Sequence, residues 1–250
     1  MNIVIFDTET TNLEKPFCYN IGYVIVNAVT REILCKKDYV CEQVWHNIPL
    51  FSTAYYAEKR QLYVAAMRAK KAILKKYGFI MRDMTRDFKN FEVKMAFAQN
   101  SSFDDKVFTF NCDYFKVNNP FENIPIMDIL PLAQKFIGFT KDYQRFCERH
   151  SLFTESGNYS CTAENLTKYI RNDIDFTEDH TALSDSIIET DILFYCEEMG
   201  ANIFQTYKKY ACVPRRMKKT FTIKKDGEIF AEIEGEKIRI SKDKTNISIT

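Results

Sequence analysis

The stretch Asn2-Ile3-Val4-Ile5-Phe6-Asp7-Thr8-Glu9-Thr10-Thr11 decides the fold of this chain. Its apolar residues run without interruption from Ile3 to Phe6, a pattern typical of a strand buried on both faces of a sheet. The strand ends in two carboxylates, Asp7 and Glu9, which point the same way because they are two residues apart. A hard divalent cation bound between them relieves the repulsion of the two like charges. The alternative is a surface turn, since Asp and Thr favour turns.

The composition indicates an ordinary globular protein. The 250 residues are 46% apolar and 28% charged, and they suffice for one large domain or for one domain with an appendage. No apolar run approaches the ~18 residues of a membrane span, and no basic signal-peptide region precedes the first strand. We therefore expect a cytoplasmic protein without a membrane segment. The eight cysteines are scattered without a CxxC pair, and no signal peptide is visible, so we interpret them as reduced, small hydrophobic residues. Cys147-x-x-His150 with Cys161 could suggest zinc, but it lacks the second matched pair of the usual four-ligand site.

The charges are distributed unevenly, although the net charge is only +1. Residues 58–94 carry eleven Lys and Arg against four Asp and Glu, a net +7, and residues 206–250 carry twelve against six, a net +6. Residues 151–205 carry two against eleven, a net −9. An acidic segment flanked by basic ones fits a metal site beside a phosphate-binding surface. Each basic segment taken alone is better explained as the solvated face of a helix.

Two further strands follow closely. Residues 19–27 and 31–40 each read as a strand, and the short break between them predicts an antiparallel hairpin that begins a mixed sheet. From 52 to 77 the apolar residues recur at helical spacing, and Gly78 is a natural helix stop. A second helix is predicted from the stripe formed by Met84, Phe88, Phe91 and Met95.

Residues 95–100 predict a short strand that runs into Asn100-Ser-Ser-Phe-Asp104. Helical periodicity resumes there, so we expect Asp104 near the start of a helix, where the helix dipole favours a carboxylate in any case. A further strand is predicted at 124–129, and short helices are predicted at 131–137, 141–150 and 162–170.

The second informative stretch runs from Glu178 to Gly200. An apolar stripe formed by Ile188, Ile192, Tyr195 and Met199 extends back, three residues before Ile188, to Asp185. A carboxylate on the buried face of a helix is costly unless it is paired or ligated. His180 lies five residues before Asp185, a spacing that places it in the preceding loop or first turn. A histidine there suits a general base, and a solvated loop histidine is the alternative.

These motifs resemble a known family. Phe6-Asp7-Thr-Glu9-Thr-Thr-Asn-Leu13, then Asn100-Ser-Ser-Phe103-Asp104, then His180-x4-Asp185 look like the three motifs of the DEDDh 3′–5′ exonucleases, which have an RNase H-like fold. The resemblance covers nearly the first four-fifths of the chain. There are two departures: Asn12 stands where glycine is common, and Gln99 stands where histidine or tyrosine is frequent.

The resemblance implies a role for each residue. Asp7, Glu9 and Asp185 would hold one Mg²⁺ or Mn²⁺ ion, and Asp104 would help to hold a second, with Asp7 bridging the two. His180 would act as general base on water. The family also implies contacts to the substrate, with Leu13 against the terminal base, Phe103 stacking nearby, and Thr8, Thr10 and Asn100 around the terminal nucleotide. The expected substrate is single-stranded DNA or RNA with a free 3′ end, and the expected products are nucleoside 5′-monophosphates.

The tail departs from a minimal exonuclease. We expect a domain boundary near residue 205, a helix at 202–210, and the basic segment Pro214-Arg-Arg-Met-Lys-Lys219. Strands are predicted at 220–225, 228–234 and 237–241, with a fourth at 246–249, and Asp226-Gly227 is a strong hairpin signal. Residues 206–250 thus predict a basic linker and a small β-meander, which could guide a single strand or bind a partner such as a polymerase or another replication or RNA-processing protein.

Two functions remain open on the sequence. The first is a metal-dependent 3′–5′ exonuclease on an α/β, RNase H-like mixed sheet flanked by helices. The second is a nucleic-acid or polymerase-binding module with a vestigial nuclease site. The presence of all four carboxylates and the histidine favours the first.

Overall fold

The computed structural model describes residues 1–208, 210, 212–215, 220–223, 229–233 and 236–240. The chain divides into two compact units, Met1–Val213 and Pro214–Thr250. This division lies beyond the expected boundary at residue 205, because Val213 is buried and pairs with Tyr159 of the first unit. Among the described residues, no helix is both long and apolar enough to span a membrane.

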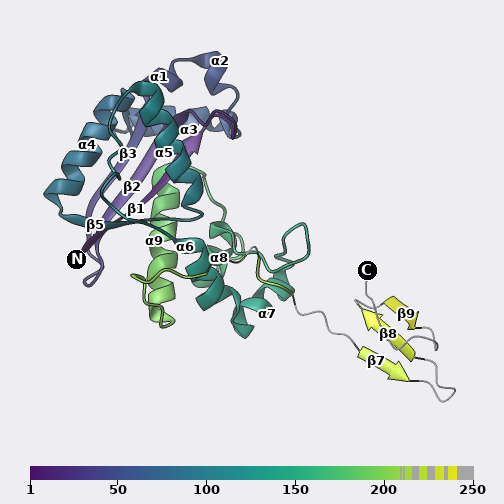
Figure 1. The fold of residues 1–250 in the computed structure, drawn as a ribbon. Coiled ribbons are helices and arrows are strands. Elements are labelled where there is room, and N and C mark those ends of the chain that lie inside the picture. Colours follow the sequence, from purple (N-terminus) through teal and green to yellow (C-terminus); the bar gives the residue numbers. More distant parts are fainter. Residues whose placement is uncertain (209, 211, 216–219, 224–228, 234–235, 241–250) are drawn as a thin grey trace. The chain divides into compact units, whose positions relative to one another are not determined.

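The first unit is built on a six-stranded mixed sheet with the order β4-β3-β2-β1-β5-β6 (Figure 1). β1 pairs antiparallel with β2 and parallel with β5, and β3 pairs antiparallel with β2, which confirms the predicted hairpin. β4 and β6 extend the sheet as parallel edge strands. The strands are β1 (Asn2–Thr10), β2 (Cys18–Asn27), β3 (Ile33–Cys41), β4 (Ile73–Lys75), β5 (Val93–Ala98) and β6 (Ile126–Asp128).

Helices cover both faces of the sheet (Figure 1). The apolar run of β1 supplies both cores, as expected for a strand buried on two sides: Val4 and Phe6 pack on the face covered by α4 and α5, and Ile3 and Ile5 pack under α9. The fold is therefore the predicted α/β, RNase H-like arrangement. The helical elements are α1 (Glu42–Trp45), α2 (Ile48–Phe51), η1 (Ala57–Lys59), α3 (Arg60–Arg68), α4 (Tyr77–Asn90), α5 (Ser102–Phe115), α6 (Ile129–Ala133), the π-helical turn η2 (Gln134–Gly138), α7 (Lys141–His150), α8 (Ala163–Arg171) and α9 (Ala182–Glu198).

The predicted helix over 52–77 is wrong. η1 and α3 end by Arg68, and the chain turns through Lys70 in the left-handed region, at φ 58°. Ile73, the last apolar residue at the helical spacing, instead pairs with β3 together with Leu74, in the edge strand β4. Gly78 does not end a helix but lies in the first turn of α4. Short apolar runs fit both periods, and the free edge of β3 decided between them.

Two other predictions differ from the structure. The stripe from Met84 to Met95 crosses an element boundary, because α4 ends at Asn90, Glu92 is left-handed at φ 51°, and Met95 lies in β5. The helix expected at 202–210 is absent from the described part of that range, where the Tyr207 hydroxyl closes a turn onto the backbone of Asn202. By contrast, α7 has the predicted bounds, and α8 (Ala163–Arg171) lies within one residue of the predicted range 162–170 at each end.

The second unit contains a three-stranded antiparallel sheet of β7 (Thr220–Ile223), β8 (Ile229–Ile233) and β9 (Glu236–Ile240). This order confirms the predicted meander and shortens its strands. The fourth strand expected at 246–249 lies outside the described residues.

Candidate active site

Three carboxylates from two distant segments meet on the α9 face of the sheet. Asp7 and Glu9 lie at the end of β1, Asp185 lies in the first turn of α9, and one oxygen from each carboxylate lies within 4.8 Å of the other two. Asp185 is buried, and its Oδ1 has no hydrogen-bond partner among the described residues. A buried, unsatisfied carboxylate oxygen beside two further carboxylates is the donor set that a divalent cation satisfies.

The backbone of β2 allows the first turn of α9 to lie close to Asp7. Gly22 pairs with Asp7 across the sheet, and a Cβ atom added to Gly22 would lie 2.0 Å from the backbone nitrogen of Leu183. Asn20 accepts a hydrogen bond from the Ala182 amide at 2.8 Å, and the Ser186 hydroxyl donates to the Gly22 carbonyl at 3.1 Å. The first turn of α9 therefore rests directly on the backbone of β2, next to Asp7.

Asp104 joins the site from the other face of the sheet. It lies in the first turn of α5, as the sequence predicted, and it is buried. The hydroxyl of Thr8, which points away from Asp7 and Glu9 along β1, donates to Oδ1 of Asp104 at 2.7 Å. Thr8 thus holds the fourth carboxylate in place and is itself buried.

The carboxylates share a strong negative field. Burial, followed by the nearby charges of Asp104 and Glu189, raises the pKa of Asp7 well above its usual value. Burial and then Asp185 raise the pKa of Glu9 to about 8. Burial is also the main cause that raises the pKa of Asp104 to about 7 and that of Asp185 to about 8. Positive charge bound at this point would oppose all these shifts, because it stabilises the ionised carboxylates.

A fifth carboxylate, which our sequence analysis missed, lies beside these four. Glu189 is buried on α9, and it accepts a hydrogen bond from the amide of Gln99 at 3.1 Å. Burial and then Asp104 raise the pKa of Glu189 well above its usual value. The signal was available, because Glu189 follows Asp185 by one helical turn and so extends the same face. It ties α9, which carries Asp185, to the end of β5, which leads to Asp104.

His180 lies in the loop before α9, in the left-handed region at φ 51°. Its ring stacks on that of Tyr56, with centroids 4.3 Å apart and planes 10° apart. Nδ1 lies 3.6 Å from the carboxylate of Glu178, a side chain that is only 11% exposed. Burial and then the charge of Lys59 lower the pKa of His180, so the neutral imidazole that a base requires is favoured.

The segment around α3 also holds the backbone of this loop. The Lys59 ammonium donates to the Asp179 carbonyl at 2.9 Å, and the Tyr63 hydroxyl donates to the His180 carbonyl at 3.3 Å. Sequence reasoning gave no sign that Tyr56, Lys59 and Tyr63 belong to the site, because they are more than 100 residues from His180.

The residues expected to contact substrate lie around the carboxylates in different environments. Leu13 follows β1 and is 72% exposed. Thr10 ends β1 at a register shift, and Asn100 follows β5 in the left-handed region at φ 58°. Phe103 is half-buried against the core.

No protein-family model matches the sequence, and no curated protein matches it. Solved structures do match. The nuclease domain of 3′hExo, described as a DEDDh family member bound to rAMP, matches with a TM-score of 0.54 at 13% identity over 83% of this chain and 96% of that chain. The fold is that of the DEDDh 3′–5′ exonucleases.

Two further structures support this fold. A full-length 3′-exonuclease matches with a TM-score of 0.52 at 13% identity, over 97% of this chain and 91% of that chain. Exonuclease I from Methylocaldum szegediense matches with a TM-score of 0.54 at 17% identity, over 81% of this chain. The present chain spans only 42% of that Exonuclease I.

Proposed function

We propose that this protein is a metal-dependent 3′–5′ exonuclease that hydrolyses single-stranded DNA or RNA to nucleoside 5′-monophosphates. The observation that carries the proposal is the convergence of Asp7, Glu9 and Asp185 within 4.8 Å, with a buried Asp185 oxygen that has no partner among the described residues. The exonuclease fold of the matching structures supports the same reaction class.

The carboxylates fit hard divalent cations such as Mg²⁺ or Mn²⁺. Asp7, Glu9 and Asp185 would hold one ion, and Asp104, with Asp7, would hold a second. Bound there, the two ions supply Lewis-acid stabilisation of the attacking and leaving oxygens of a phosphodiester. Thr8 and Glu189 keep the carboxylate-bearing elements in register through their hydrogen bonds to Asp104 and to the Gln99 amide.

His180 would take the proton from the attacking water. Its lowered pKa keeps the ring neutral near pH 7, and Tyr56 fixes the plane of the ring by stacking. Leu13, exposed just beyond β1, would pack against the terminal base and exclude a strand that continues past the 3′ end.

The test is a hydrolysis time course with single-stranded DNA and RNA of matched sequence, labelled at the 5′ end. The purified protein is incubated with Mg²⁺, with Mn²⁺ or with EDTA. We expect a metal-dependent ladder that shortens from the 3′ end, and the faster ladder identifies the preferred sugar. Binding of both strands without cleavage in either metal would instead support a binding module with a vestigial nuclease site.

A further inference from the structure

A row of aromatic side chains leads away from the carboxylates. Phe17, in the turn after Leu13, contacts Tyr114 of α5 edge to face, with ring centroids 4.8 Å apart. Tyr114 contacts Phe115 at 5.0 Å, and Phe115 stacks on Tyr77 at 5.0 Å. Tyr114 is 60% exposed although it belongs to this packed row. The row thus connects the turn after β1 with the first turn of α4.

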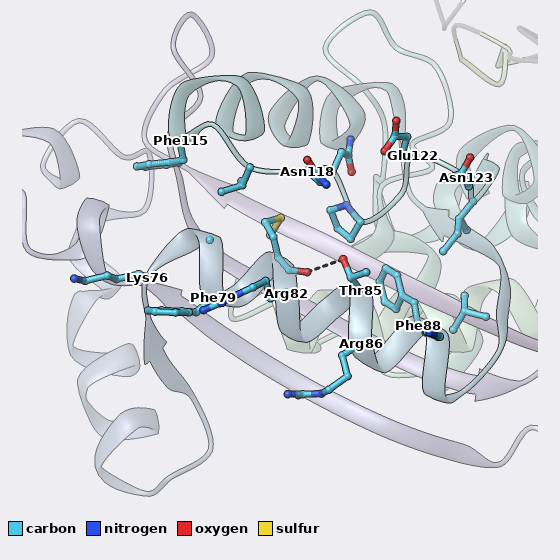
Figure 2. A pocket seen from close by; sticks show the side chains of 18 of the residues that line it. Lys76, Phe79, Arg82, Thr85, Arg86, Phe88, Phe115, Asn118, Glu122 and Asn123 are labelled. Atoms are coloured by element: carbon cyan, nitrogen blue, oxygen red, sulfur yellow. Dashed lines mark hydrogen bonds between the residues drawn. The ribbon is translucent and has the colours of Figure 1, made fainter.

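The row ends at a groove between α4 and the segment that follows α5. The groove has a volume of about 1370 Å³, and Figure 2 shows Phe115 and Asn118 on one wall with Phe79 and Arg82 of α4 on the other. Phe79 is 45% exposed, and the Arg82 guanidinium lies over its ring, 4.3 Å from the centroid. Lys76 lies at the same end. This end therefore offers a stacking surface beside two positive charges.

The end of the groove lined by Lys76 lies at the edge of the sheet that carries the carboxylates, because Lys76 directly follows β4. Glu9 pairs with Asn20, Asn20 pairs with Val40, and Val40 pairs with Leu74, so these residues lie side by side across four strands. Three strand spacings amount to about 14 Å. Lys76, two residues beyond Leu74, is therefore at the same sheet edge as Glu9, at a distance that a few nucleotides span.

We propose that the row and the basic end of the groove form one binding track for the single strand 5′ of the end held at the carboxylates. This edge track consists of Phe17, Tyr114, Phe115, Phe79, Arg82 and Lys76. The inference rests on the proposed exonuclease function and adds to it a second region of substrate contact.

The chemistry of the edge track favours a nucleic acid over a peptide. Aromatic rings that stack on bases, combined with positive charge along the backbone, are how proteins bind single strands without regard to sequence. The α4 side of the track, with Lys76, Phe79 and Arg82, lies within the basic segment 58–94, whose net charge of +7 complements phosphates. An acidic peptide shares the charge but has no bases to stack on the exposed rings of Tyr114 and Phe79.

The test measures binding without hydrolysis. A fluorescent single strand of about 20 nucleotides, or one of about 4, is titrated in EDTA with the wild type and two double variants: Tyr114→Ala with Phe79→Ala, and Lys76→Glu with Arg82→Glu. We expect each double variant to bind the longer strand at least about fivefold more weakly, with unchanged affinity for the shorter one. The charge variant should also reduce the slope of log K against log salt by about 1.

Controls separate binding from folding. Lys141→Glu, at an exposed position on α7, should leave both affinities unchanged. Tyr114→Phe with Phe79→Tyr keeps both rings and should restore the affinity for the longer strand. Equal affinities of the wild type and both double variants for that strand would overturn the proposal and leave the groove to another occupant, such as an acidic peptide. Weaker binding by the variants in a protein that never hydrolyses would support the edge track and contradict the proposed function.

Discussion

Gly22 of β2 lies against the backbone of Leu183 in α9, so closely that a Cβ atom at Gly22 would be 2.0 Å from the Leu183 nitrogen. A side chain at Gly22 would force the backbone of β2 or of α9 to move, at a high cost in free energy. We expect Gly22→Ala to cost at least about 3 kcal/mol and to lower the Tm by roughly 6–12 °C. It should also weaken Mn²⁺ binding, because it displaces Asp185. Thermal melts with and without Mn²⁺ measure both effects.

Gly78→Ala is the matched control for Gly22→Ala. Gly78 lies in α4, where an added Cβ would meet only a side-chain methyl of Val117 at 3.1 Å, and alanine favours a helix. Its Tm should therefore change by no more than a few degrees. An equal loss of Tm in Gly22→Ala and Gly78→Ala would mean that the close approach of α9 to β2 does not account for the destabilisation.

Asp104 and Asp105 form a natural pair for testing the carboxylate assignments. Asp104 is buried at the site, whereas its neighbour Asp105 points to solvent. Asp104→Asn should reduce hydrolysis by at least about a hundredfold, since it removes a charge from the reacting centre. Asp105→Asn should retain activity within about twofold. Rates from the labelled-strand ladder decide this, and comparable activity of the two variants would remove Asp104 from the site.

The shifted carboxylate pKa values predict an unusual pH dependence of stability without metal. Asp7, Glu9, Asp104, Asp185 and Glu189 all have folded-state pKa values raised above their unfolded values of about 4. The folded state therefore holds more protons, and its stability falls as the pH rises toward about 8. In EDTA the Tm should decrease between about pH 6 and pH 8.5, and the rise in Tm on adding Mn²⁺ should grow over the same range.

Glu189→Gln isolates the contribution of one carboxylate to this pH dependence of stability. The amide oxygen can still accept the Gln99 N–H bond, but the charge beside Asp7 is gone. We expect a higher Tm in EDTA near pH 8 and weaker Mn²⁺ binding. Asp191→Asn, an exposed change on the same helix, should show neither change. Unchanged Mn²⁺ affinity in Glu189→Gln would mean that the charge of Glu189 does not act on the metal-binding carboxylates.

The stack of His180 on Tyr56 predicts a graded loss of rate. His180→Ala should slow hydrolysis by roughly 10²–10⁴, the usual effect of removing a positioned base. Tyr56→Ala should lower kcat by roughly 2- to 10-fold, since an aromatic pair contributes about 0.5–1.5 kcal/mol. Tyr56→Phe keeps the ring and should match the wild type. A pH–rate profile provides the check, because a role as base predicts loss of the acidic limb in His180→Ala.

Local patterns were enough to predict much of the fold, and together with the resemblance of three motifs to a known family they pointed to the four carboxylates. The uninterrupted apolar run of β1 predicted a strand buried on both faces, and the apolar stripe of α9 pointed to Asp185, because it places a carboxylate on the buried face of the helix. In both cases the pattern lies within a single element, so no knowledge of distant contacts is required. Predictions failed where the period was ambiguous, as at Ile73 and Leu74, because only the free edge of β3 decides that these residues form a strand.

Only the tertiary structure decided that the carboxylates converge and which residues surround them. The sequence determined that Asp7, Glu9, Asp104 and Asp185 lie at the ends of strands and at the starts of helices. Their convergence depends on Gly22, whose missing side chain allows one backbone to rest on another, and no local pattern marks that contact. The setting of His180 likewise depends on Tyr56, because stacking is made between segments that are far apart in the sequence. Local periodicity reports what each element buries, whereas a site arises from how the elements pack.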